Sequence, residues 1–174
     1  MSEDVRREMV ALLPRLRRFA YSLTGSMEEA DDVVQSACAK ALDRLDQYRL
    51  GTRLDSWMFR IVQTTWLDQV RSAPARTTAA DPDALDRAVS IDPIEERVVA
   101  RDALARIQRA LTGLPEEQRV LLSLVVIDGL SYAQAAECLG IPTGTVMSRL
   151  SRARRRLADA IDEQKQPNAR GSKR

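Results

Sequence analysis

Apolar side chains recur at spacings of three and four residues through most of the chain, which is the pattern of amphipathic helices. We expect Pro14 to start or kink the first helix, because proline lacks the amide hydrogen that a helix interior uses. No segment alternates between apolar and polar residues for long enough to indicate a sheet. The pattern therefore predicts an all-α fold. In the first helix the apolar positions are Met9, Leu12, Leu13, Leu16, Phe19, Ala20 and Leu23.

Capping and turn residues predict where the next helices begin and end. Ser26 and Glu29 have the spacing of a capping box, and a third helix should cover residues 54–71. The run 92–95, Asp-Pro-Ile-Glu, combines an N-cap, a proline at the first helical position and a reciprocal glutamate. It predicts the start of a helix that ends at Gly113.

The second half continues with two more helix signals. Pro115 should begin a helix that stops at Gly129. Ser131 with Gln134 should cap another, which stops at Gly140.

Residues 132–151 have the spacing of a helix-turn-helix, with a second helix from about Thr143. Ala136 is small where the two helices would cross, and Val146 is apolar where the second packs on the first. Gly140 can adopt the left-handed backbone that the tight turn requires. This motif predicts DNA binding.

The second helix of this motif separates an apolar stripe from a polar, basic face. Residues 147–158 contain five arginines and no acidic residue. Arginine binds phosphate and can contact guanine through two hydrogen bonds. The alternative is a helical hairpin whose basic face is only solvated. The stripe is Val146, Leu150, Ala153, Leu157 and Ile161; the face comprises Met147, Ser148, Ser151, Arg152, Arg154 and Arg155.

A second candidate site lies in the first half, where four of the seven aromatic residues fall among arginines. Such pairs can hold the unstacked bases of single-stranded DNA. Aromatic residues at helical spacing are more often part of a core, so both interpretations stay open. Trp57 and Ile61 in particular should be buried. The aromatics are Tyr48, Trp57, Phe59 and Trp66, and the arginines are Arg49, Arg53, Arg60 and Arg71.

Composition divides the chain into two helical domains. Residues 74–93 contain three prolines, many small residues and no sustained apolar period, which predicts a flexible linker. We therefore place one domain at 1–73, a second with the helix-turn-helix at 94–164, and a disordered basic tail at 165–174. The net charge of +2 is unevenly distributed along the chain. Residues 1–72 are neutral, with 11 basic and 11 acidic side chains, whereas residues 113–174 carry 10 basic and 7 acidic side chains.

Several classes of function have little support. Without histidine the chain cannot form a Ser-His-Asp triad or an imidazole metal site, and two cysteines cannot complete a zinc site of four thiolates. We interpret Cys38 and Cys138 as core residues. No Gly-Lys phosphate loop, signal core or membrane-length apolar segment occurs. We expect a cytoplasmic protein that is not an enzyme and has no cofactor, no metal and no membrane insertion.

Residues 9–163 resemble the extracytoplasmic-function (ECF) sigma factors, the promoter-recognition subunits of bacterial RNA polymerase. The segments that carry the resemblance are MEEADDVVQSACAKAL at 27–42, LDSWMFRIVQTTWLDQVR at 54–71 and LPEEQRVLLSLVVIDGLSYAQAAECLGIPTGTVMSRLSRARRRL at 114–157. The resemblance implies two helical domains, core RNA polymerase and promoter DNA as partners, and control by an anti-sigma factor.

It also implies roles for particular residues. The helix around Asp31 would dock on the polymerase clamp, residues 54–71 would open and read the −10 element, residues 114–127 would contact the flap, and the helix from Thr143 would enter the −35 major groove. The docking set is Asp31, Asp32 and Gln35; the −10 set is Arg53, Trp57, Arg60, Gln63, Thr64 and Arg71; the −35 set is Thr143, Thr145, Met147, Ser148, Ser151, Arg152, Arg154 and Arg155.

Some positions depart from the family pattern. Gln63 and Thr64 stand where the family usually has Arg-Asn, and Cys38 replaces an aromatic residue. Met147 replaces a residue that is commonly basic, and Ser151 one that is often larger. The base preferences of the family therefore do not transfer to this chain.

Two other functions remain as alternatives. A stand-alone helix-turn-helix regulator would explain the second half only. A sigma-like decoy that sequesters an anti-sigma factor would explain the whole fold. Because neither domain carries many phosphate-binding charges, we expect the isolated protein to bind promoter DNA weakly, with most of the affinity supplied by core polymerase.

Overall fold

The computed structural model describes residues 3–49, 51–72 and 94–165, and within these ranges it contains helices and turns but no strand. The all-α prediction is confirmed. The predicted linker, the run 92–93 before the fourth helix and nearly all of the predicted tail lie outside the described residues.

The first half is a three-helix unit made of α1 (Glu3–Thr24), α2 (Met27–Asp43) and α3 (Leu54–Ser72), with a short 3₁₀ turn η1 (Leu45–Gln47) before α3. Each helix packs on the other two. Phe19 of α1 and Phe59 of α3 are fully buried and meet edge to face, with ring centroids 5.1 Å apart. This aromatic contact fixes α3 against α1.

Pro14 was expected to start or to kink the first helix. It does not start one, because α1 is helical from Glu3 and continues through Pro14. Proline removes the hydrogen bond to the carbonyl of Val10. Val10 is 64% exposed, so water can satisfy that carbonyl. Met9 before the proline and Leu16 after it are both buried, and their burial holds the two parts of the helix in register.

The second half contains α4 (Ile94–Thr112), α5 (Glu116–Leu122), a π-helical turn η3 (Ser123–Ile127), α6 (Tyr132–Leu139) and α7 (Thr143–Lys165). One helix was expected from Pro115 to Gly129, but it changes to π geometry at Ser123. The amide of Asp128 donates to the carbonyl of Ser123 at 3.1 Å, and Gly129 then ends the segment with φ +70°.

The predicted caps are present where the structure describes them. Ser26 Oγ accepts a hydrogen bond from the amide of Glu29 at 3.4 Å. Ser131 and Gln134 form a full capping box at the start of α6, with bonds of 3.2 and 2.8 Å.

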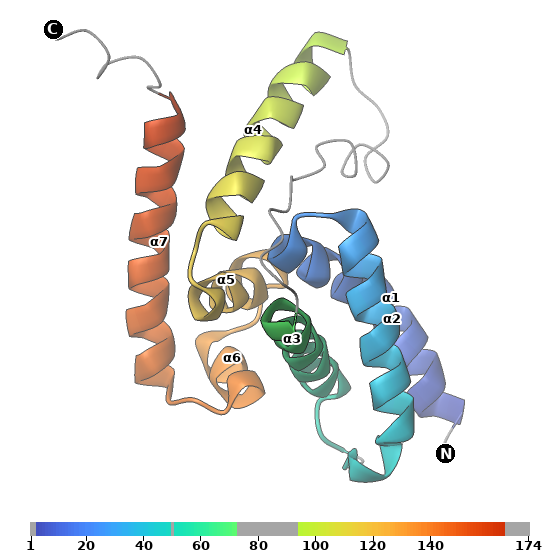
Figure 1. Cartoon of the computed structure of the whole chain (residues 1–174). Coiled ribbons are helices and arrows are strands. Elements are labelled where there is room, and N and C mark those ends of the chain that lie inside the picture. The colour runs from blue at the N-terminus through green and yellow to red at the C-terminus, as the bar shows by residue number, and fades with distance from the viewer. Residues whose placement is uncertain (1–2, 50, 73–93, 166–174) are drawn as a thin grey trace, which may run out of the picture.

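The helix-turn-helix has the geometry that its sequence predicts. Gly140 ends α6 with φ +65°, and Ala136 and Val146 are buried where α6 meets α7. Leu157 and Ile161, expected in the buried stripe, are only half-buried. The C-terminal turns of α7 extend beyond α5 and α6 and lie beside α4, which α7 also contacts (Figure 1).

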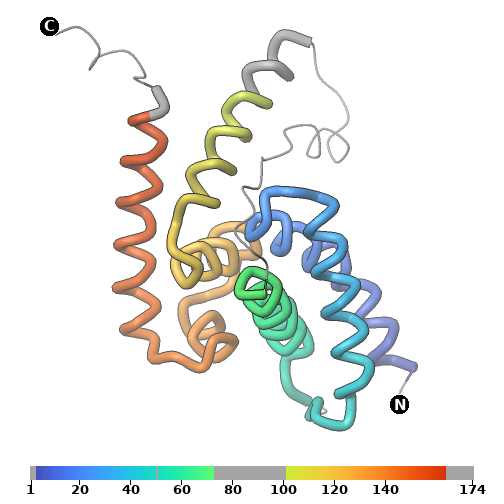
Figure 2. Tube along the Cα trace, in the orientation of Figure 1, coloured from blue at the N-terminus to red at the C-terminus, as the bar shows by residue number. Residues whose placement is uncertain are grey.

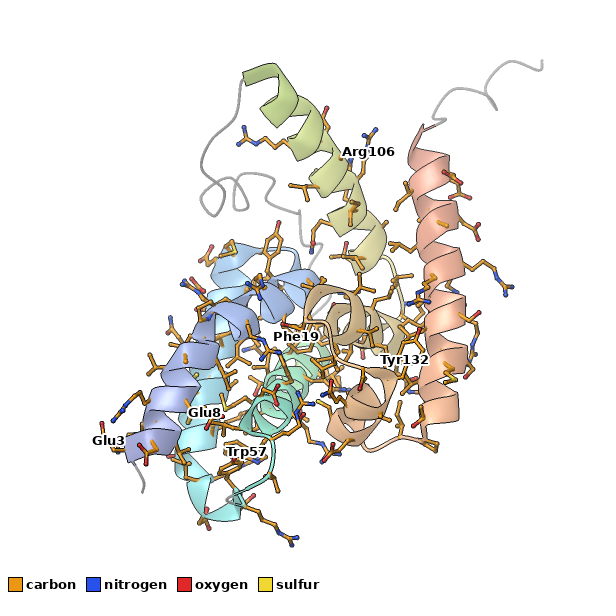
Figure 3. The ribbon with its side chains drawn as sticks, turned by 180° about the vertical axis from the view of Figure 1, so that it is seen from behind. Glu3, Glu8, Phe19, Trp57, Arg106 and Tyr132 are labelled. Carbon is orange, nitrogen blue, oxygen red and sulfur yellow. The ribbon has the colours of Figure 1, made fainter. Side chains whose placement is uncertain are left out.

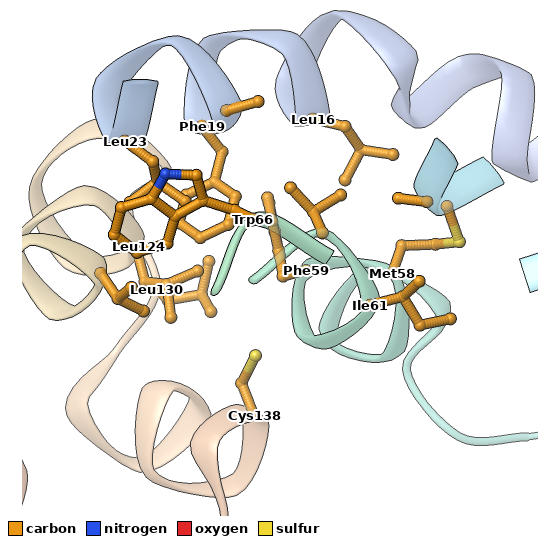
Figure 4. Close-up of a cluster of buried hydrophobic side chains, with 14 of the residues drawn as sticks. Leu16, Phe19, Leu23, Met58, Phe59, Ile61, Trp66, Leu124, Leu130 and Cys138 are labelled. Carbon is orange, nitrogen blue, oxygen red and sulfur yellow. The ribbon is translucent and has the colours of Figure 1, made fainter. Parts of the chain in front are cut away.

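The two halves pack on each other and share one apolar core. Figure 2 shows α3 lying between the α1–α2 pair and the α5–α6 segment, and α3 contacts α6 directly. In the close-up of Figure 4, Leu23 and Trp66 of the first half face Leu124 and Leu130 of the second. All four side chains are buried. The core therefore crosses the boundary that composition placed at residues 74–93.

Gly140 and Gly144 provide a matched test of the turn between α6 and α7. Gly140→Ala should destabilise the protein by about 1 kcal/mol, because alanine is strained at positive φ. Gly144→Ala should leave stability unchanged or raise it by up to about 1 kcal/mol, because Gly144 is helical and a methyl group there would meet no atom within 4 Å. Urea denaturation of both variants measures the difference. Equal effects of the two substitutions would contradict the role of Gly140.

Candidate nucleic-acid interface

The outer face of α7 is polar, basic and open to solvent. Val146, Leu150 and Ala153 are buried, so α7 is fixed by one side only. Within the −35 set Thr145 alone is half-buried, and the exposed members are Thr143, Met147, Ser148, Ser151, Arg152, Arg154 and Arg155.

Hydrogen bonds hold part of this face in place. Arg152 Nε donates to the carbonyl of Ser148 at 3.3 Å, within the helix. Arg154 Nη2 lies 3.3 Å from the hydroxyl oxygen of Tyr132, at the start of α6 (Figure 3). Both guanidinium groups are therefore oriented before any ligand binds, which reduces the entropy lost on binding.

Arg149 joins α7 to α5 and is not part of the exposed face of α7. Its Nη1 pairs with Glu117 Oε2 of α5 at 2.9 Å, and its side chain is half-buried. The charge of Arg149 is thus partly neutralised within the protein.

The aromatic cluster divides between core and surface. Phe59 and Trp66 are buried, as the core interpretation requires. Trp57 is only half-buried and packs against Tyr48, with ring centroids 5.3 Å apart. The burial predicted for Ile61 is confirmed, whereas Trp57 keeps an accessible edge.

Three members of the −10 set face the second half. A methyl group at Gly140 would come within 2.6 Å of Arg60 Nη2, so the Arg60 guanidinium lies against the turn of the helix-turn-helix. Gln63 and Arg71 line a cleft of about 310 Å³ between α3 and the second half. Thr64 is exposed, and its hydroxyl lies 3.0 Å from the carbonyls of Arg60 and Ile61.

The docking set lies along one exposed side of α2. Asp32 and Gln35 are exposed. Asp31 accepts two hydrogen bonds of 2.6 Å from Arg17 of α1, and those bonds with the arginine charge hold the pKa of Asp31 below its ordinary value. Asp31 is therefore already paired within the protein.

Sequence reasoning missed a charged network that joins the two halves. Arg15 of α1 lies 3.5 Å from an oxygen of Asp55 and 3.8 Å from an oxygen of Asp128, and Arg53 binds Asp55 at 2.7 Å. No local spacing indicates the two pairs of Arg15, because they join α1 to α3 and to the end of η3.

The two carboxylates of this network differ in their environment. The Asp128 side chain is 0% exposed, and within the described residues neither of its oxygens accepts a hydrogen bond. Burial raises the pKa of Asp128 to about 6, although Arg15 and Arg18 oppose the shift. Burial also raises the pKa of Asp55, but hydrogen bonds from Arg53 and the Ser56 amide outweigh it and leave that pKa below its ordinary value.

Both cysteines pack against the apolar core. Cys138 is buried and Cys38 half-buried, and neither forms a disulfide. Burial raises the pKa of both thiols, that of Cys138 to about 12. A protonated, buried thiol is a poor nucleophile, which supports a packing role.

Two family patterns match the chain: sigma-70 region 2 at residues 9–76 and sigma-70 region 4 at residues 104–157. The ECF RNA polymerase sigma factor EcfG of Rhodopseudomonas palustris (strain TIE-1) is 32% identical over 158 residues, which are 91% of this chain and 85% of EcfG. This chain belongs to the ECF RNA polymerase sigma factors. SigM of Mycobacterium tuberculosis, also an ECF sigma factor, is 37% identical over 144 residues, or 83% of this chain and 70% of SigM.

Solved structures agree with this assignment. The sigma factor RpoE of Bartonella quintana, solved in complex with the anti-sigma factor NepR, matches with a TM-score of 0.72 and 30% identity, over 92% of this sigma factor and 98% of RpoE. CnrH, solved with the cytosolic domain of CnrY, matches with a TM-score of 0.67 and 25% identity, over 91% of this chain and 87% of CnrH. Among the described helices, none combines the length and apolar character that a bilayer span requires.

The buried Asp128 predicts how stability of the sigma factor depends on pH. The pKa of Asp128 is raised on folding, so the cost of burying its charge is fully present above about pH 6 and is relieved as pH falls toward 4. Asp128→Asn should therefore melt at a higher temperature than the wild type at pH 8. The difference should shrink below pH 6, because the wild-type carboxylate then protonates.

Asp55→Asn is the matched control with the opposite sign. The pKa of Asp55 is lowered on folding, so its ionised form stabilises the fold above its ordinary pKa, and the variant should melt lower than the wild type at pH 8. Thermal unfolding followed by circular dichroism from pH 4 to 8 measures both. A melting temperature of Asp128→Asn at or below the wild-type value at pH 8 would contradict this description of the network.

Proposed function

We propose that this sigma factor reads promoters through two separate surfaces, with α7 in the major groove of the −35 element and α3 at the −10 element. The observation that carries the proposal is the exposed face of α7. That face presents serines and arginines and no acidic side chain over residues 147–158, opposite the buried Val146 and Leu150. Serine and arginine donate hydrogen bonds to base edges and phosphates.

At the −10 element, the half-buried pair of Tyr48 and Trp57 offers aromatic surface for an unstacked base. Arg53, four residues before Trp57 in the sequence, is held by Asp55. Capture of an unpaired base offsets part of the unpairing cost, which is about a few kcal/mol. The chain supplies binding energy for strand separation and no covalent step of its own.

The exposed side of α2 is the surface proposed to dock on the polymerase. Asp32 and Gln35 are available there, while Asp31 is held by Arg17. Docking on a basic partner surface would therefore use Asp32 directly, and would use Asp31 only if the partner replaces Arg17.

An anti-sigma factor is the second proposed protein partner. Support comes from RpoE of Bartonella quintana, which was solved with such a factor and matches both halves of this chain. The first half also separates this protein from a stand-alone helix-turn-helix regulator, because residues 9–76 match sigma-70 region 2. The decoy function is not favoured, since the EcfG and SigM relatives are themselves named as sigma factors.

Arg152→Ala should reduce −35-dependent transcription by about tenfold, because a good arginine contact to a base contributes about 1 to 3 kcal/mol. Run-off transcription with core polymerase from the host measures the effect. Arg109→Ala is the control: it removes the same charge from an exposed position near the end of α4 and should leave transcription unchanged. Equal activity of Arg152→Ala and the wild type would remove Arg152 from the −35 set.

The exposed side chain of Met147 predicts a contact with a thymine of the −35 element. It is 53% exposed on an otherwise polar helix face, and an apolar side chain in the major groove can contact the methyl group of thymine. Replacing one −35 thymine by deoxyuridine should weaken holoenzyme binding about fourfold, as expected for one buried methyl group. The same replacement should have no effect on Met147→Ala holoenzyme. Equal losses for both proteins at every thymine would contradict a thymine contact by Met147.

A further inference from the structure

We propose that Asp55 is a positioning residue: it holds the guanidinium of Arg53 so that the outer edge of that group binds a guanine of the −10 element. The proposal rests on the proposed role of α3 at the −10 element. It requires that Asp55 is itself fixed and that Arg53 keeps hydrogen-bond donors for a ligand. It also requires that a neutral base suits those donors better than a phosphate does.

Asp55 is fixed by donors from both α1 and α3. Its Oδ1 accepts a hydrogen bond from the amide of Ser56 at 2.7 Å, and its Oδ2 lies 3.5 Å from Nη1 of Arg15. The side chain of Asp55 is only 16% exposed. Burial raises the pKa of Asp55, but the hydrogen bonds from Arg53 and from the Ser56 amide outweigh burial and leave that pKa below its ordinary value. The carboxylate is therefore ionised at neutral pH and anchored to two helices.

Asp55 binds one edge of the Arg53 guanidinium and leaves the opposite edge open. Arg53 Nε donates to Oδ1 at 3.1 Å, and Arg53 Nη2 donates to Oδ2 at 2.7 Å. A guanidinium has five N–H groups, so three remain, and no other group among the described residues accepts them. One N–H of Nη1 and one of Nη2 form the outer edge, and the Arg53 side chain is 35% exposed. Arg53 can therefore make a second bidentate contact while it stays bound to Asp55.

The backbone that carries Arg53 is also held in place. The carbonyl of Arg53 accepts a helical hydrogen bond from the amide of Trp57 at 3.2 Å, at the start of α3. Just before it, the Tyr48 hydroxyl donates to the carbonyl of Thr52 at 2.7 Å, and the Tyr48 ring packs on Trp57. Because both its backbone and the end of its side chain are fixed, Arg53 loses less entropy when it binds DNA.

The charge of Asp55 favours a neutral ligand over a phosphate. A phosphate on the outer edge would share the guanidinium with the Asp55 carboxylate, and the two negative charges would repel each other. Guanine carries no net charge, and its N7 and O6 atoms are two adjacent acceptors that match the two donors of an arginine edge. On the base edges that face the major groove, no other base presents such a pair of acceptors. The arrangement therefore selects guanine.

A purely structural role of Asp55 makes a different prediction. An acidic residue in the first turn of a helix stabilises that helix by itself, so loss of Asp55 should lower stability in either case. Only a positioning role connects Asp55 to base preference, and it does so only through Arg53. Base preference and thermal stability therefore have to be measured separately.

The hold of Asp55 on Arg53 can be measured without DNA. In the free, full-length protein the Nε hydrogen of Arg53 should exchange with solvent about tenfold more slowly than that of Arg109, which is exposed. NMR spectra of isotope-labelled protein resolve these signals, and Arg53→Ala and Arg109→Ala assign them. Asp55→Asn should remove the difference, and Asp55→Glu should keep part of it. Equal exchange at Arg53 and Arg109 in the wild type would overturn the positioning role.

Base preference is measured by run-off transcription with core polymerase from a pool of templates. The pool is a host promoter that the wild type transcribes, with its −10 segment randomised. The wild type should favour guanine at one position by about tenfold, as expected for one bidentate contact. Arg53→Ala should remove this preference, Asp55→Asn should reduce it to about threefold or less, and Asp55→Glu should restore part of it. A preference for a base other than guanine that Arg53→Ala abolishes would overturn the guanine contact.

Two further variants complete the test. Arg53→Ala/Asp55→Asn should have the same base preference as Arg53→Ala, because Asp55 acts through Arg53. Ser22→Ala is the stability control, since it removes a buried hydrogen bond to Ser123 that is separate from Asp55. It should lower the melting temperature and leave the guanine preference unchanged. The preference is a ratio within one protein, so a smaller folded fraction does not alter it.

The outcomes separate this proposal from the proposed function. Loss of the guanine preference in Arg53→Ala but not in Asp55→Asn would overturn the positioning role. A loss of transcription in Arg53→Ala that is equal for every base would indicate a phosphate contact and overturn the guanine contact. Absence of transcription by the wild type from every host promoter would instead contradict the proposed function, and the exchange rates would still decide whether Asp55 holds Arg53.

Discussion

The arrangement of this protein depends on one half-buried guanidinium, that of Arg119. The last turn of α1 contains no basic residue, so its carbonyl groups and the negative end of the helix dipole need a donor from elsewhere. Arg119 supplies it from the other half, through Leu23, and covers the ring of Trp66. A helix end in one half is thus completed by a side chain of the other.

A second polar contact between the halves, that of Asp128 with Arg15, lowers stability instead of raising it. Asp128 is buried beside Arg15, and neither of its carboxylate oxygens accepts a hydrogen bond from the described residues. Burial raises the pKa of Asp128 to about 6. A buried charge with incomplete pairing costs stability. The contact between the halves is therefore stabilised by Arg119, by Ser22 with Ser123 and by the shared core, and is weakened at Asp128.

Much of the fold could be predicted from local sequence, but the way in which the two halves pack on each other could not. Ser131, Gln134 and Gly140 act on their own neighbours, so spacing alone predicted the capping box, the left-handed turn and the helix-turn-helix. The π turn at Ser123 was missed, because the signals at Pro115 and Gly129 indicate only where that segment starts and stops. Pro14 lies inside α1, so it does not start a helix. The exposed face of α7 was predictable from periodicity. The position of Arg60 against Gly140, and the pairs of Arg15, depend on contacts that the chain makes across its two halves and that no local pattern contains.

Small-angle X-ray scattering of the free, full-length protein tests the central claim most directly, because it measures the separation of the halves without labels or substitutions. A compact protein of this length has a radius of gyration of about 16 Å. We predict a value of about 16 to 19 Å and a distance distribution with a single maximum. A radius above about 22 Å, with a second maximum from two separated lobes, would contradict the claim that the two halves share one core.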